Sequence, residues 1–327
     1  MLLVILMAAT LFTNALEHFG EKLGFSEGLT GSVFAAVATA LPETVIPLMA
    51  LFVGTSNPEV GTEIGVGAIL GAPFMLSTLS ISLMAFAVLP QRGLRGHFEP
   101  ETTGLARDLN VFLVAFGVAA LALYVPHEQK MVHMLLAIGL VSLYVVYVTL
   151  TVRASGRLVT CGCGSHCTTA EDPLLLTRIG LPNRFAVIIV QLLLGVILLL
   201  GGAKGFIVGV ESGAQILGIS ALLLSLLIVP IATELPEKIN SILWIRRRKD
   251  TLAFGNITGA LVFQGTLLPA VGMVLTPWAP SKEVMASVAL TLVGALWVRM
   301  MLARGRIKTW HLLFNTALYI AYLFLVL

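Results

Sequence analysis

The sequence predicts an all-α integral membrane protein in which ten transmembrane helices form two inverted-topology repeats of five, with helices 2 and 7 broken. Three observations lead to this fold class. Of the 327 residues, 57% are hydrophobic and only 11% are charged. Lysine and arginine gather in alternate loops, and one six-residue phrase occurs once in each half of the chain. A soluble domain has no need of so much apolar surface.

Ten apolar stretches are long enough to cross a bilayer as helices. They lie at about 2–20, 28–53, 63–90, 109–125, 131–152, 184–209, 214–245, 251–275, 284–302 and 309–326. The first stretch lacks the basic leading region of a signal peptide, so we count it as a membrane span.

Basic residues alternate between the two sides of these spans. The loops after odd-numbered spans hold 15 of the 20 lysines and arginines, whereas the loops after even-numbered spans hold only Lys130 and Lys282. The positive-inside rule then places the basic loops in the cytoplasm and both termini outside it, in a multi-pass protein of the plasma (inner) membrane. The basic run 246–249 sits beside a span, where it fixes topology and meets lipid headgroups rather than nucleic acid.

The phrase at residues 38–43, Ala-Thr-Ala-Leu-Pro-Glu, returns at 232–237 as Ala-Thr-Glu-Leu-Pro-Glu. Residues 17–43 match 211–237 at ten positions without a gap. Because each half has an odd number of spans, the second half must enter the membrane from the opposite face. We therefore expect a first repeat at 1–152, a cytoplasmic loop at 153–183 and a second repeat at 184–327.

Proline lies inside the second and seventh spans. A helical proline removes one backbone donor and clashes with the preceding turn, so these helices should bend or break near Pro42 and Pro236. The freed carbonyls and the threonine hydroxyls one turn before each glutamate are candidate cation ligands. These residues are Ala38, Thr39, Ala232 and Thr233.

Glu43 and Glu237 follow the two prolines, and an ionisable residue in a membrane span is by default a functional candidate. Two inverted copies would bring the two carboxylates together. With carbonyl and hydroxyl oxygens they form a ligand set for a hard cation such as Ca²⁺. The same pair can carry protons, because two close carboxylates titrate as a unit. A purely structural glutamate is the alternative, and the matched second copy argues against it.

Pairs of small residues follow each phrase, as Gly67 with Gly71 and Gly255 with Gly259. Such pairs allow close helix packing, and they can also admit a ligand near the backbone.

These residues resemble the alpha repeats of the calcium:cation antiporter superfamily, whose best-known branch is the sodium/calcium exchangers. The family pattern is roughly Gly-Thr-Ser-x-Pro-Glu, followed by a helix with Gly-Asn-x-x-Gly-Ser-Asn. The resemblance implies that Glu43 and Glu237 bind the cation and that Thr39 and Thr233 help to form sodium sites. It also implies that Asn256 is a ligand. This residue corresponds to the first asparagine of the family's second motif, which the first repeat lacks.

The chain also departs from the family pattern. The serine of the first motif is replaced by Ala40 and Glu234, and the Ser-Asn pair becomes 72–73 Ala-Pro and 260–261 Ala-Leu. Glu234 lies four residues before Lys238, at ion-pair spacing on one helical face. This pair is either a fixed charge in place of a bound cation or a structural ion pair. The transport class carries over from the resemblance, whereas the ion selectivity does not.

Three cysteines and a histidine lie within seven residues of the central loop, as Cys161, Cys163, His166 and Cys167. Thiols are mostly reduced in the cytoplasm, and this set could complete a Zn²⁺ site. The alternative is a thiol-bearing loop without metal.

The sequence therefore predicts a secondary active cation antiporter that exchanges Ca²⁺ for Na⁺ or H⁺ by alternating access, with no cofactor. Its partners would be the lipid bilayer and inorganic cations. Two alternatives stay open, which are a Na⁺/H⁺ or other cation/H⁺ exchanger of the same fold and a metal-sensing membrane protein without transport. A membrane enzyme is disfavoured, because no His-Glu-x-x-His motif occurs and the aspartates, at 108, 172 and 250, are expected in loops or at span edges.

Overall fold

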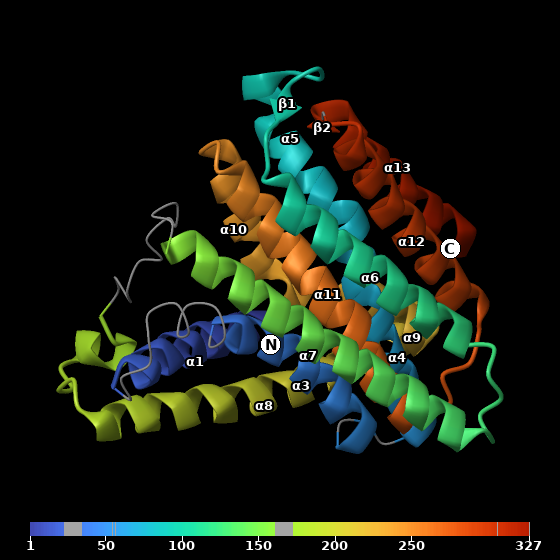
Figure 1. The fold of residues 1–327 in the computed structure, drawn as a ribbon. Coiled ribbons are helices and arrows are strands. Elements are labelled where there is room, and N and C mark those ends of the chain that lie inside the picture. Colours follow the sequence, from blue (N-terminus) through green and yellow to red (C-terminus); the bar gives the residue numbers. More distant parts are fainter. Residues whose placement is uncertain (23–34, 54, 56, 161–172, 306, 327) are drawn as a thin grey trace.

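The computed structural model describes residues 1–22, 35–53, 55, 57–160, 173–305 and 307–326, and it shows a bundle of helices (Figure 1). The long elements are α1 (Leu2–Lys22), α3 (Ala35–Phe52), α4 (Pro58–Met75), α5 (Ile81–Arg92), α6 (Thr102–Ala122), α7 (Lys130–Thr160), α8 (Phe185–Leu217), α9 (Ala221–Thr233), α10 (Leu235–Arg246), α11 (Asp250–Leu275), α12 (Lys282–Ala303) and α13 (Thr309–Val326). A π-helical turn (Leu76–Ser80) joins α4 to α5, and a 3₁₀ turn (Leu175–Ile179) precedes α8. The strands β1 (His97–Phe98) and β2 (Ile307–Lys308) pair antiparallel.

Seven helical segments of the described chain are long and apolar enough to cross a membrane. They are Pro58–Arg92, Thr102–Ala122, Lys130–Arg153, Phe185–Leu217, Asp250–Leu275, Lys282–Ala303 and Thr309–Val326. Shorter apolar helices occur at Leu2–Leu16, Ala40–Phe52 and Ala221–Ile231. The expectation of a helical membrane protein is thus confirmed.

Side-chain caps mark several helix starts. Asn57 accepts a hydrogen bond from the Glu59 amide before α4, and Glu101 accepts two, at 2.7 Å each, before α6. Ser220 and Ser281 do the same for α9 and α12. Each cap satisfies amide groups that the first helical turn leaves without a partner.

The seventh predicted span is broken, as expected. Here α9 ends at Thr233, α10 begins at Leu235, and Glu234 between them has φ −92° and ψ 10°. Pro236 falls in the first turn of α10, where a missing amide hydrogen costs little. The interruption therefore lies just before the proline.

The expected break at Pro42 is wrong, because α3 continues through Pro42 and Pro47. A proline inside a helix removes one hydrogen bond, and membrane helices tolerate this where neighbouring groups compensate. In the same helix, Thr44 Oγ1 donates to the carbonyl of Ala40 at 2.8 Å. The two copies of the phrase thus have different backbone conformations.

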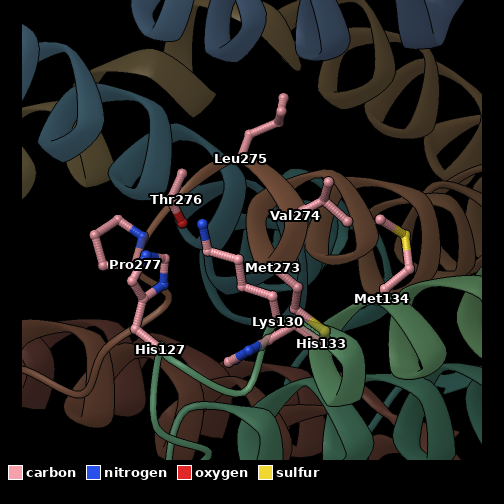
Figure 2. A pocket seen from close by; sticks show the side chains of 9 residues that line it. All are labelled: His127, Lys130, His133, Met134, Met273, Val274, Leu275, Thr276 and Pro277. Atoms are coloured by element: carbon pink, nitrogen blue, oxygen red, sulfur yellow. The ribbon is translucent and has the colours of Figure 1, made fainter.

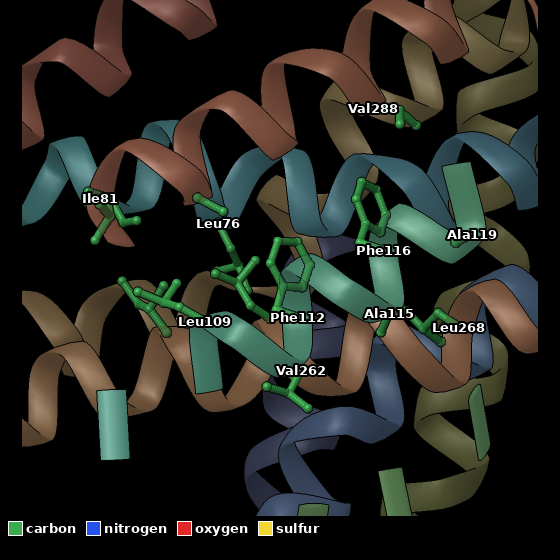
Figure 3. Close-up of a cluster of buried hydrophobic side chains, with 14 of the residues drawn as sticks. Leu76, Ile81, Leu109, Phe112, Ala115, Phe116, Ala119, Val262, Leu268 and Val288 are labelled. Atoms are coloured by element: carbon green, nitrogen blue, oxygen red, sulfur yellow. The ribbon is translucent and has the colours of Figure 1, made fainter. Parts of the chain in front are cut away.

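The main hydrophobic cluster lies between α6, α11, α12 and the π-helical turn (Figure 3). Phe112 and Phe116 stack at 5.3 Å between ring centroids at its centre. Val262 of α11 and Leu76 of the turn pack in the same cluster. A second cluster joins α1, α3, α4, α8 and α9, and Figure 1 shows α1 and α8 side by side. Between them, the two clusters hold α3, α9 and α11 in place.

Gly67 and Gly71 let α4 approach the backbone of α9 closely. A Cβ at Gly67 would lie 2.6 Å from the Leu222 carbonyl oxygen, and one at Gly71 would lie 2.9 Å from Leu226 Cα. A Cβ at Gly255 or Gly259 meets no described atom within 4 Å. Close packing is therefore seen for the first pair, and the expectation of it for the second pair is not met in the described part of the chain.

Helix α7 continues to Thr160, into the expected central loop, while its membrane-competent part ends at Arg153. The cysteine cluster, residues 161–167, lies outside the described residues. Within the described ranges, no three histidine, cysteine, aspartate or glutamate side chains are arranged to hold a metal ion. The proposed Zn²⁺ site thus has no support from the structure.

We expect Gly71→Ala to destabilise the protein by about 1–3 kcal/mol, because the added methyl group must push α4 away from α9. Thermal unfolding of the purified protein in detergent measures the loss. Gly139→Ala in α7 is the matched control, since its Cβ meets no described atom within 4 Å. Equal unfolding temperatures for the two variants would contradict the close packing.

Candidate cation site

Three buried glutamates form an acidic cluster, defined as Glu43, Glu234 and Glu237. Glu43 comes from α3, Glu234 from the α9–α10 break and Glu237 from the first turn of α10. Their exposed fractions are 4%, 0% and 4%. Glu43 interacts electrostatically with both other carboxylates. The structure thus brings together the two glutamates that the repeat singled out.

Lys238 and Gln264 contact this cluster from two sides. Lys238 Nζ lies 3.1 Å from Glu234 Oε2 and donates to the Pro230 carbonyl at 2.9 Å. It thereby compensates the charge of Glu234 and gives a second donor to the Pro230 carbonyl, which also accepts from the Glu234 amide at 3.1 Å. Gln264 Nε2 of α11 donates to Glu234 Oε1 at 3.3 Å, and Gln264 also makes a polar contact with Glu43.

Several oxygens of the cluster are buried without a hydrogen-bond partner among the described residues. They are Glu43 Oε1, Glu237 Oε2 and Glu234 Oε2, of which the last is in the ion pair with Lys238, and Gln264 Oε1 beside the cluster also lacks a hydrogen-bond partner. A buried carboxylate oxygen without a donor is energetically costly, because water no longer solvates its charge. The oxygens of Glu43 and Glu237 are therefore available to a cation or a proton.

Asn256 and Thr233 support the cluster through the backbone. Asn256 Nδ2 donates to the Glu237 carbonyl at 3.0 Å and to Ser241 Oγ at 2.9 Å, which ties α11 to α10. Thr233 is buried beside Glu234, and its hydroxyl donates to the Val229 carbonyl at 3.2 Å. In this conformation Asn256 holds α10 against α11, and the Thr233 side chain hydrogen-bonds within α9.

Four of the expected ligand or hinge positions are described by their backbone alone. Ala38 and Thr39 belong to the first turns of α3, Ala232 to the last turn of α9 and Pro236 to the first turn of α10. Their side chains lie outside the described part of the structure. Their backbones flank Glu43 and the helix break, which is the region that the sequence predicted.

Gln264 and Asp108 are buried polar residues of the spans that were not recognised from the sequence. Gln264, at 0% exposure, is an isolated amide in an apolar stretch, and that isolation was the available signal. Asp108 was expected at a span edge but lies inside α6 at 6% exposure. It accepts hydrogen bonds from Tyr147 Oη at 3.1 Å and Thr258 Oγ1 at 3.0 Å. These bonds join α6 to α7 and α11.

Comparison with known proteins gives sequence relatives and solved structures that resemble this chain. The inner membrane protein YrbG of Escherichia coli (strain K12) is 25% identical over 280 residues, which covers 84% of this chain and 78% of YrbG. The crystal structure of the H⁺/Ca²⁺ exchanger CAX superposes with a TM-score of 0.72 at 20% identity, covering 99% of this chain and 80% of that one.

The sodium-calcium exchanger NCX_Mj, soaked with Na⁺ and Sr²⁺, superposes with a TM-score of 0.56 at 20% identity, covering 98% of this chain and 95% of the other. At these identities the two structures establish a shared fold.

The model of the sodium/calcium exchanger protein family matches residues 1–153 and 187–327. These residues include the acidic cluster and most of the chain. The protein therefore belongs to the sodium/calcium exchanger family, whose members are membrane cation exchangers and not enzymes.

Proposed function

We propose that this protein is a secondary active antiporter that exchanges Ca²⁺ for Na⁺ or H⁺ by alternating access, with Glu43 and Glu237 as central ligands. The carrying observation is a pair of buried carboxylates, one from each half of the chain, with oxygens that lack donors among the described residues. Carboxylate and amide oxygens suit Ca²⁺. Glu234 is already paired with Lys238, so two carboxylates are left for the transported ion.

The charges of the cluster explain why such a site exchanges ions. Three carboxylates and one ammonium leave two negative charges when all are ionised. Bare buried charges are costly, so the site favours an occupant that neutralises them. One Ca²⁺ does so, and so do two protons or two Na⁺. The site holds either Ca²⁺ or the monovalent ions, but not both at once. Movement of the loaded site between the two membrane faces therefore exchanges Ca²⁺ for those ions.

H⁺ is the favoured counter-ion within this proposal. Both copies of the second motif lack the Ser-Asn pair, so several oxygen ligands expected for sodium are absent from the sequence. Close carboxylates take up protons as a coupled unit. Exchange of a monovalent cation for H⁺ is the second candidate, and the same two carboxylates would serve it.

We also propose the ten-span inverted repeat, with the central loop at 153–183 between its halves. The seven long apolar segments and the three shorter ones fall close to the ten predicted spans. The two halves also pack in corresponding ways. Helix α11 of the second half lies against α6 and α7 of the first, and in the first half α4 lies against α12 and α5 against α13. The family match is interrupted between 153 and 187, around the proposed loop.

Glu43→Gln and Glu237→Gln should each abolish gradient-driven uptake of radiolabelled Ca²⁺ into everted membrane vesicles, because an amide neither balances the cation nor exchanges a proton. Glu128→Gln is the control, since Glu128 is exposed in the loop between α6 and α7. Membrane insertion is checked by immunoblotting. Wild-type uptake in either glutamate variant would remove that residue from the mechanism.

Lys238→Met should lower the free energy of unfolding by about 3–5 kcal/mol, because Glu234 would stay buried without its counter-charge. The double variant Glu234→Gln/Lys238→Met removes both charges and should recover much of that loss. Denaturant unfolding in detergent measures both variants. A double variant as unstable as the single one would show that the ion pair is not the source of the effect.

A fusion of alkaline phosphatase to the C-terminus should be active, and a green fluorescent protein fusion at the same place should be dark, because the basic-loop pattern puts this end outside the cytoplasm. Fusions after residue 94 should behave in the opposite way. A fluorescent C-terminal fusion would contradict the proposed orientation.

A further inference from the structure

A pocket of about 330 Å³ opens where α7 begins and α11 ends, and no residue of the acidic cluster lines it. Its polar lining comes from the turn before α7 and from the first turn of α7, with the end of α11 opposite (Figure 2). The lining includes His127, Lys130, His133, Met273, Thr276 and Pro277. The sequence places this end at the membrane face that is poor in basic residues.

His133 is the feature that indicates a ligand. Its side chain is 3% exposed, and its Nε2 atom has no hydrogen-bond partner among the described residues. Figure 2 shows the side chain lining the cavity with His127 and Lys130. A buried imidazole nitrogen normally has a partner, because its desolvation is otherwise uncompensated. A hydrogen-bonding group that enters the pocket would supply one.

The charges around the pocket select an anion. Lys130 brings an ammonium group, the two imidazoles can donate hydrogen bonds, and the N-terminus of α7 adds a positive dipole end. Lys130 is one of only two basic residues in the loops of this face. A phosphate group fits this set of donors.

The opposite wall of the pocket is held in a fixed conformation. Thr276 Oγ1 donates to the Gly272 carbonyl at 2.7 Å, and the indole of Trp278 donates to the Ala119 carbonyl at 3.0 Å. Trp278 is buried and has a φ of 44°, an uncommon value that its packing sustains. The site is thus preformed, and a ligand need not order it.

An apolar groove of about 590 Å³ adjoins the pocket. The two share Met134, Val274 and Leu275, and the groove continues between α7 and α11 as far as Thr44 of α3. Ile138 and Val274 on its walls are 54% and 44% exposed. In a membrane protein such a surface faces acyl chains rather than water.

We propose that the pocket and the groove together bind one anionic phospholipid. The phosphate lies among His127, Lys130 and His133, and an acyl chain occupies the groove between α7 and α11. A cationic pocket that opens into an apolar groove matches the two ends of such a lipid. The chain end then lies beside Thr44, the residue next to Glu43 in the acidic cluster.

Native mass spectrometry of the purified full-length protein tests this proposal. Phosphatidylglycerol and phosphatidylethanolamine with the same acyl chains are titrated separately. We expect phosphatidylglycerol to bind about five-fold more tightly, since one basic residue near anionic lipid contributes about 1 kcal/mol. Lys130→Gln should remove this preference. Lys282→Gln is the matched control, since Lys282 is exposed on the same face, and it should keep the preference.

Two further variants separate the headgroup from the acyl chain. His127→Gln, at an exposed position, should weaken phosphatidylglycerol binding even if His133→Gln fails to fold. Ser142→Trp, which fills the groove, should weaken both lipids. Equal affinity for the two lipids, an equal effect of Lys282→Gln, or displacement of the lipid by an equal concentration of glycerol phosphate would overturn the proposal.

Discussion

Three carboxylates that share a single ammonium group are the constraint on which the rest of this structure depends. Glu43, Glu234 and Glu237 are almost fully buried, and only Glu234 has Lys238 within ion-pair distance. Removing ionised groups from water is costly unless their charge is compensated. In the proposed mechanism the remaining two carboxylates bind a mobile positive partner, and this binding is the physical basis of exchange.

The surrounding helices serve to hold these carboxylates together. The break at Glu234 places Glu234 and Glu237 where both interact electrostatically with Glu43, and Lys238 donates to the Pro230 carbonyl beside the break. Asn256 fixes the first turn of α10 against α11, and Gln264 reaches the cluster from the same helix. The close contact of α4 with α9 at Gly71 holds α9, the first part of the broken helix, in position.

The sequence predicted the parts of this arrangement that follow from repetition and polarity. Glu43 and Glu237 stood out because charged residues are rare in apolar spans, and their matched positions implied that they meet. The spacing of Glu234 and Lys238 predicted their ion pair. Gly67 and Gly71 predicted a close helix contact.

Other features depend on packing that no local pattern encodes. The unbroken helix at Pro42 and the broken one before Pro236 have nearly the same local sequence, so tertiary surroundings decide between them. Gln264 and Asp108 acquire their roles from partners distant in the chain, such as Thr258 for Asp108. The different surroundings of Gly71 and Gly259 likewise arise from neighbours that the repeat alone does not specify.

Anomalous diffraction from crystals soaked with Ca²⁺ would locate the bound ion most directly. We expect one peak between the carboxylates of Glu43 and Glu237, with oxygen ligands at about 2.3–2.6 Å. A saturating soak that leaves this position without density, or that places the ion away from both glutamates, would contradict the central claim.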